Sequence, residues 1–189
     1  LRALTEAGLG VDEAFGQLEF RYAATADQFL TIAKLRAARR LWDRVGEVSG
    51  ASPDARAQRQ HAVTSSVMTT QRDPWVNLLR ATVACFAAGV GGADVVTVQP
   101  FDAALGLPDA FSRRIARNTS TLLVAESHVA NVADPAGGHF SVITPVRQAA
   151  GALPQGRPAR NIRARSVAAK AKTASKRGTR GSVSQCQLR

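Results

Sequence analysis

The chain has 189 residues, with 25 lysines and arginines against 14 aspartates and glutamates and a formal net charge of +11. This length suffices for one domain with an apolar core, and the apolar content of 45% is typical of a globular protein. Residues 144–189 hold 11 of the basic residues and none of the acidic ones, so residues 1–143 carry 14 charges of each sign. The basic character therefore belongs to the C-terminal segment and not to the predicted fold.

The sequence also argues against several classes of protein. No apolar run approaches the roughly 18 residues that a membrane span requires, and residues 1–15 lack the regions of a secretory signal. The two cysteines, Cys85 and Cys186, are too few for a disulfide framework or a zinc site. We therefore expect a cytoplasmic protein without a metal site.

Residues 17–45 predict a strand followed by a helix. Leu18, Phe20 and Tyr22 alternate with other residues, which is the period of a half-buried strand. Thr25 and Gln28 have the spacing of a capping box, so we expect a helix to start there and to run to about residue 45. Its apolar stripe should comprise Phe29, Ile32, Ala33, Ala37 and Leu41.

The following segments repeat this order of strand and helix. Residues 59–66 predict a strand, and Asp73 and Pro74 are typical of a helix start that leads to the glycines at 89–92. Residues 95–98 are almost wholly apolar, as in a strand buried on both faces. A further helix begins near residue 108, and residues 129–132 predict a short strand. The helix from residue 75 is expected to bury Leu78, Leu79, Val83 and Phe86.

Strand and helix alternate about four times with short connections, which indicates a parallel α/β fold. The right-handed crossover leaves two architectures, an open doubly wound sheet or a partial (βα)8 TIM barrel. A whole barrel takes about 250 residues, so residues 1–143 supply about half of one and leave two unpaired strand edges. Residues 144–189 have no aromatic residue and no apolar period, and we predict a disordered basic tail.

Seven short segments within residues 1–139 carry a family resemblance. They are FLTIAKLRAARRLW (29–42), RQHAVTS (59–65), RDPWVN (72–77), ALGLPDAF (104–111), RIARNT (114–119), ES (126–127) and DPAGG (134–138). In order and spacing they resemble the adenosylcobalamin-dependent acyl-CoA mutases, and most of all the small subunit of the heterodimeric bacterial enzymes. The resemblance implies the later βα units of a substrate-binding TIM barrel.

The resemblance also implies a function. That family interconverts methylmalonyl-CoA and succinyl-CoA by radical chemistry that adenosylcobalamin starts. Catalytic members have Arg-Thr-His-x-Gln-Thr-Ser-Gly where this chain has Gln60, Val63 and Ser66 in place of Thr, Gln and Gly, and the cobalamin motif Asp-x-His-x-x-Gly does not occur in it. We therefore expect a structural small subunit that forms a heterodimer with the catalytic large subunit. The isolated chain should be inactive, with adenosylcobalamin and acyl-CoA bound only by the assembled enzyme.

Two residues are candidates for a site. His61 matches the family histidine near substrate and corrin and is expected in the C-terminal half of its strand, where barrels carry their chemistry; the alternative is a structural histidine. Glu126 matches a glutamate near the corrin edge, and the alternative is an exposed carboxylate at a helix end. We expect the basic run of the first long helix to be a solvated face: Arg36, Arg39, Arg40 and Arg44.

Two other functions stay open. The chain is alternatively a piece of a catalytic acyl-CoA mutase with a working site at His61 and Glu126. It is otherwise a nucleic-acid-associated protein whose tail neutralises phosphates, although the lack of interleaved aromatic residues argues against nucleic acid as a partner. The tail departs from the family, whose members continue with an aromatic and acidic segment, and a shifted reading frame is one explanation. Its central basic residues are Lys170, Lys172, Lys176, Arg177 and Arg180.

Overall fold

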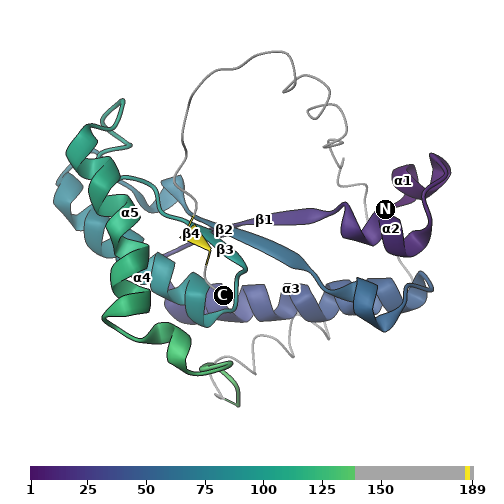
Figure 1. Ribbon diagram of the computed structural model, residues 1–189. Coiled ribbons are helices and arrows are strands. Elements are labelled where there is room, and N and C mark those ends of the chain that lie inside the picture. The colour runs from purple at the N-terminus through teal and green to yellow at the C-terminus, as the bar shows by residue number, and fades with distance from the viewer. Residues whose placement is uncertain (139–185, 188–189) are drawn as a thin grey trace.

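The computed structural model describes residues 1–138 and 186–187 (Figure 1). Three strand and helix units follow one another in the chain: β1 with α3, β2 with α4, and β3 with α5. In chain order the elements are α1 (Arg2–Glu6), α2 (Val11–Gly16), β1 (Glu19–Ala24), α3 (Gln28–Val48), η1 (Pro53–Arg56), β2 (Arg59–Thr64), η2 (Ser66–Met68), α4 (Pro74–Val90), β3 (Val95–Thr97), α5 (Ala110–Ala125), η3 (Val129–Asn131) and β4 (Cys186–Gln187).

The described strands form one sheet in the order β1-β2-β3-β4. β1 is parallel to β2 over its whole length, with Ala24 beside Thr64, and β2 is parallel to β3, with Val63 beside Thr97. The carboxyl ends of β1, β2 and β3 therefore meet at one edge, which we call the carboxyl edge. This confirms the predicted α/β class with parallel strands.

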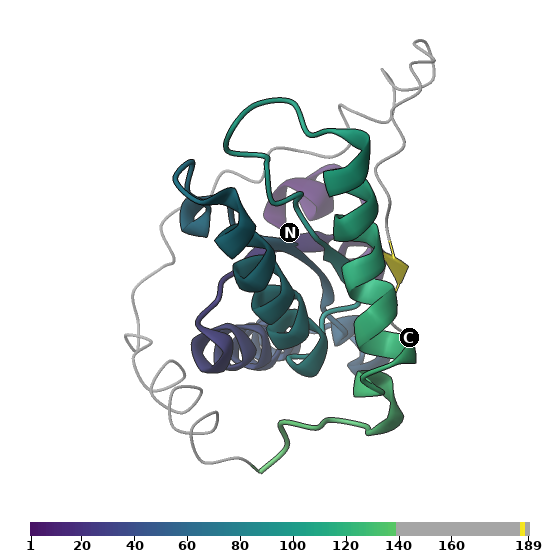
Figure 2. The same ribbon diagram turned by 90° about the vertical axis from the view of Figure 1, so that its left-hand side faces the viewer.

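Helices cover one face of this sheet. The core comprises Leu35 of α3, Ala62 and Val96 of the sheet, and Ala84 and Cys85 of α4, none of them more than 1% exposed. Figure 2 shows α3 and α4 side by side on this face, and the two helices are in contact. No described helix covers the opposite face, which we call the open face. Because side chains alternate along a strand, the open face carries Glu19, Arg21, His61, Val63 and Thr97.

The start of α3 differs from the prediction. Its N-cap is Asp27, whose Oδ1 accepts a hydrogen bond from the Leu30 amide at 3.2 Å. The Thr25 hydroxyl instead lies 3.1 Å from the hydroxyl of Thr31, which also accepts from the Thr25 amide. The capping box was therefore wrong by two residues, because a partner in the second turn of the helix engages Thr25 and leaves the cap to Asp27.

Other expectations from the apolar pattern were also wrong. Residues 129–132 contain the 3-10 helix η3 (Val129–Asn131) in place of a strand. Phe29 and Leu79 were expected inward but are 45% and 64% exposed. Asp73 precedes α4 as predicted, but its backbone is left-handed, with a φ of 54°, and its side chain makes no capping hydrogen bond. The apolar periodicity of a helix predicts which face is directed to the core, but it does not predict which residues lie at the exposed margin of that face.

The predicted tail lies almost wholly outside the described residues. Of residues 144–189, the structure describes only Cys186–Gln187, which form β4 and pair antiparallel with β3. For these two residues a strand replaces the predicted disorder.

The core makes a prediction for stability. Leu35→Ala should destabilise the fold by about 2–5 kcal/mol, because the side chain is fully buried between helix and sheet and its removal leaves a cavity. Thermal and denaturant unfolding measure the loss. Leu30→Ala on the same helix is the control, because Leu30 is 58% exposed and should cost less than about 1 kcal/mol. Equal losses for the two variants would contradict the placement of the core.

Candidate functional site

His61 lies on the open face between two polar neighbours. Its Nε2 is 2.8 Å from the hydroxyl oxygen of Thr97, and its Nδ1 is 3.4 Å from a carboxylate oxygen of Glu19. The imidazole is 12% exposed, whereas the Glu19 side chain is 62% exposed. In the tautomer with its proton on Nδ1, the ring N–H faces the Glu19 carboxylate and Nε2 accepts from the Thr97 hydroxyl. The neighbours therefore hold the ring in one orientation across three strands.

The position of His61 along the strand corrects the sequence prediction. His61 is the third of the six residues of β2 and lies beside Val95, the first residue of β3, so it is in the first half of its strand. Val63 is nearer to the carboxyl edge on the same face. Gln60 is 1% exposed and belongs to the helix-covered face. Gln60, which stands in place of the Thr of the catalytic pattern, therefore affects the packing of the helices on the sheet. Val63, which stands in place of the Gln, affects the open face.

Glu126 does not contact His61 in the structure. It directly follows the last residue of α5, is exposed, and donates its backbone N–H to the carbonyl of Leu122 at 2.9 Å. Within the described part of the chain, no hydrogen bond or ion pair joins Glu126 to His61. The two candidates from the sequence thus do not form one site in this structure.

Asn77, near the start of α4, joins the two loops that leave the carboxyl edge after β2 and β3. It is completely buried, and its Nδ2 donates to the carbonyl of Thr70 at 2.8 Å and to that of Phe101 at 3.0 Å. Its Oδ1 accepts from the Thr70 amide at 3.0 Å and from Arg80 at 2.9 Å. All four bonds that a carboxamide can make are therefore formed, which fixes both loops against α4.

Between these loops lies a cavity of about 320 Å³. Gln71 crosses from one loop to the other and donates to the carbonyl of Ala104 at 3.1 Å. The lining offers hydroxyls, carboxamides and methyl groups and no charged side chain, which suits a neutral polar group. It comprises Ser66, Thr69, Gln71, Gln99, Ala103 and Ala104.

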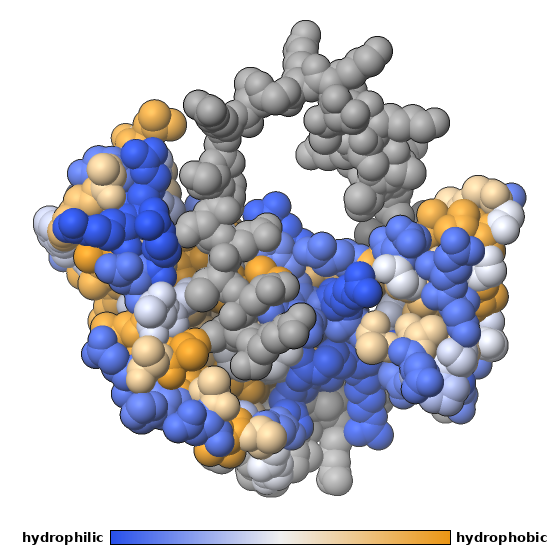
Figure 3. All heavy atoms as spheres, in the orientation of Figure 1, coloured by the Kyte–Doolittle hydropathy of each residue, from blue (hydrophilic) through white to orange (hydrophobic). Residues whose placement is uncertain are grey.

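Exposed apolar side chains surround the same loops. Trp75 stacks on Phe101 with ring centroids 4.9 Å apart and is itself 63% exposed. Figure 3 shows apolar residues in orange among hydrophilic ones at this end of the molecule, over α4, α5 and the loop before α5. We call this group the apolar patch: Val67, Trp75, Leu79, Leu105, Leu107 and Phe111, which are 43% to 96% exposed.

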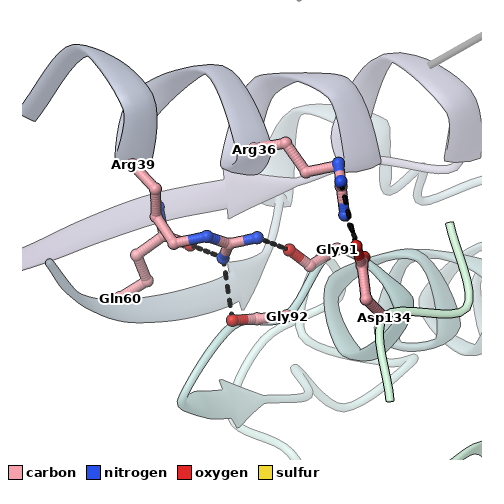
Figure 4. A network of polar contacts seen from close by, with 6 residues as sticks. All are labelled: Arg36, Arg39, Gln60, Gly91, Gly92 and Asp134. Atoms are coloured by element: carbon pink, nitrogen blue, oxygen red, sulfur yellow. Dashed lines mark hydrogen bonds and ion pairs between the residues drawn. The ribbon is translucent and has the colours of Figure 1, made fainter. Parts of the chain in front are cut away.

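The arginines of α3 are not all solvated, as the charge run had suggested. Arg39 is half-buried and donates to the side-chain oxygen of Gln60 at 2.8 Å and to the carbonyls of Gly91 at 2.6 Å and Gly92 at 2.9 Å (Figure 4). Burial of the Arg39 guanidinium lowers its pKa, and the positive charge of the nearby Arg36 lowers this pKa further. Gly92 has a φ of +79°, and a Cβ there would lie 3.1 Å from the Arg39 guanidinium. The glycine run that ends α4 thus makes room for this cation.

Arg36 holds the segment that follows α5. Its guanidinium pairs with both carboxylate oxygens of Asp134, one of them at 3.1 Å (Figure 4). This hydrogen bonding holds the pKa of Asp134 below its usual range. Ala136 packs beside Ile32 and Ala33 of α3 two residues later. The expectation of a solvated face holds for Arg44, which is 66% exposed and paired with Glu47.

Sequence reasoning missed Glu19, Thr97, Asn77 and the role of Arg39. The alternation in β1 does place Glu19 opposite the apolar residues, but only the register of the strands brings it to His61. Asn77 was detectable as a polar residue near the apolar face of a helix. Within the described part of the chain, no group of three or more His, Cys, Asp or Glu could hold a metal ion. In that same part, no helix combines the length and apolarity needed to cross a bilayer.

Comparison with known proteins places the chain in a family. Residues 1–146 match the family model described as methylmalonyl-CoA mutase. This α/β chain, with parallel strands and helices on one face, therefore belongs to the methylmalonyl-CoA mutase family. It is 76% identical over 142 residues to the methylmalonyl-CoA mutase small subunit of Streptomyces virginiae, which covers 75% of this chain and 23% of that protein.

Two further relatives extend this result. The small subunit from Propionibacterium freudenreichii subsp. shermanii is 51% identical over 153 residues, which is 80% of this chain and 24% of that protein. The methylmalonyl-CoA mutase of Escherichia coli is 38% identical over 143 residues, which is 75% of this chain and 20% of that protein. The chain thus spans about a quarter of the length of the small subunits that it matches.

The role of Asn77 can be tested. Asn77→Asp should destabilise the fold by about 2–4 kcal/mol, because the carboxylate no longer donates to the carbonyls of Thr70 and Phe101 and is buried. Denaturant unfolding measures this loss. The same change at the exposed Asn118 of α5 is the control. A loss of stability no larger than that of Asn118→Asp would refute the assigned role.

Proposed function

We propose that the chain is a fragment of the small subunit of a methylmalonyl-CoA mutase. Its role is to pair with the catalytic large subunit and to stabilise the heterodimer that interconverts methylmalonyl-CoA and succinyl-CoA. The identity of 76% to a protein named methylmalonyl-CoA mutase small subunit carries this proposal. The methylmalonyl-CoA mutase of Escherichia coli, whose name specifies no subunit, is only 38% identical to this chain. This lower identity favours a small subunit over a piece of a catalytic chain.

We infer that residues 1–143 are later βα units of a TIM barrel. The three consecutive units, the parallel strands and the one-sided cover of helices support this architecture over a doubly wound sheet, which has helices on both faces. In a closed ring the open face would be the interior. β1 pairs only with β2 among the described strands, so its other edge is free to continue the ring.

The described residues do not fit the role of a cobalamin site. The open face presents Val63 near the carboxyl edge, and this side chain neither donates nor accepts a hydrogen bond. His61 is occupied by Thr97 and Glu19, and Glu126 lies apart at a helix end. We therefore propose that adenosylcobalamin and acyl-CoA are held by parts of the enzyme outside this chain. His61 then acts as a structural residue that ties three strands together.

The apolar patch supports a role in pairing. The patch contains the aromatic residues Trp75 and Phe111, and aromatic residues are enriched in protein interfaces. Trp75 and Phe111 are connected through the buried Phe101, so the patch is held rigidly. A rigid patch loses little conformational entropy when a protein surface covers it.

Pairing can be tested by gel filtration. The folded chain, mixed with a catalytic large subunit of a bacterial methylmalonyl-CoA mutase, should elute with it as one complex. The Leu35→Ala variant is the control, because it weakens the fold without changing the surface and should reduce co-elution. Separate elution of the intact chain at every concentration would overturn the proposed role.

The proposal also predicts what the chain lacks. After incubation with adenosylcobalamin and gel filtration, the isolated chain should show no corrin absorption, and it should show no isomerase turnover. Retained corrin or measurable turnover would favour a catalytic chain. His61→Ala would then show whether this activity needs the histidine.

A further inference from the structure

A second cavity lies on the helix-covered side, between α3, the turn after α4 and the segment that contains η3. Its volume is about 990 Å³. Three arginines of α3 line it together with two carboxylates and several small apolar side chains. We propose that this cavity binds a phosphate group carried by a small ligand. The residues that matter are Arg36, Arg39, Arg40, Asp94, Val132 and Pro135.

The spacing along α3 brings the arginines together. Arg39 and Arg40 follow Arg36 by three and four residues, so both lie one turn further along the same side of the helix. Figure 4 shows Arg36 and Arg39 extending from α3 toward the turn after α4 and toward Asp134. Arg40 is exposed at the cavity and has no acidic partner within 4.0 Å among the described residues.

The charges in the cavity are not balanced. All three hydrogen-bond partners of Arg39 are neutral, two backbone carbonyls and a carboxamide, so they hold its guanidinium without cancelling its charge. Asp94 directs a carboxylate oxygen to the backbone amide of Gln60 at 2.7 Å, and Asp134 is paired with Arg36. Among the described residues, Arg40 is thus left without an acidic partner, beside a second cation that is fixed in place.

Asp134 shows how an oxyanion fits this cavity. Its two carboxylate oxygens meet the guanidinium of Arg36, and its side chain is still 54% exposed. A guanidinium binds phosphate in the same two-point way, and a doubly charged phosphate is attracted more strongly than a carboxylate. Val132, Pro135 and Val90 offer apolar surface for the remainder of the ligand. This site lies away from the carboxyl edge and does not depend on the proposed function.

Calorimetric titration of the 189-residue chain with inorganic phosphate tests the proposal. At low ionic strength and about pH 8, phosphate should bind at one site. Arg40→Gln should weaken the affinity about tenfold, because one charge-assisted hydrogen bond is lost. Arg44→Gln is the matched control, because Arg44 lies one turn further along α3, pairs with Glu47 and does not line the cavity. It should change the affinity less than twofold.

A second variant changes binding in the opposite direction. Asp134→Asn keeps the size of the side chain but removes the competing charge from Arg36, so phosphate should bind several-fold more tightly. Circular dichroism checks that each variant keeps its helices. Equal losses for Arg40→Gln and Arg44→Gln, no gain for Asp134→Asn, or acetate binding as tightly as phosphate would each overturn the proposal.

Discussion

The packing of this protein depends on one buried carboxamide, that of Gln60 in the middle strand. Its Nε2 donates to the carbonyl of Leu35 in α3 at 2.9 Å and to Gln58 at 2.6 Å, and its Oε1 accepts from Arg39. Its backbone amide donates to Asp94, just before β3. A buried amide without partners would cost several kcal/mol, so strand, helix and turn have to keep their present distances. Arg39 and the glycine carbonyls at the end of α4 complete this network.

This network divides the sheet into two faces with different roles. On the helix-covered face, small residues such as Ala62 and Ala84 let the helices approach the strands closely, and Gln60 satisfies the polar groups that this approach buries. On the open face, His61 is held by Glu19 and Thr97 in a polar row. In the proposed barrel, closure of the ring by other units would bury that row.

The two faces of the sheet also explain why the differences from the sequence pattern of the catalytic members have different consequences. Residues 60 and 63 differ from that pattern within one strand, yet they face opposite ways. The Gln60 side chain is hydrogen-bonded to Arg39 and to the carbonyl of Leu35, so position 60 belongs to the packing of α3 against the sheet. Position 63 carries an apolar side chain on the open face, and so bears on what that face can bind. The cavity beside α3 is a third region, which is charged and separate from both.

Local patterns were enough to predict the strands β1, β2 and β3, the helices between them and the α/β class. These patterns were an alternation in β1, an apolar run in β3, and capping residues with apolar stripes in the helices, and all of them depend on neighbours in the chain. The family could likewise be inferred from seven short segments. The partners of His61, the buried Asn77 and the function of Arg39 could not be predicted, since each depends on residues 7 to 53 positions away. The register of the strands and the approach of α3 to the end of α4 decide those contacts, and local sequence carries no signal for either. For the same reason, the periodicity correctly placed Phe29 and Leu79 in helices but wrongly predicted that their side chains are buried.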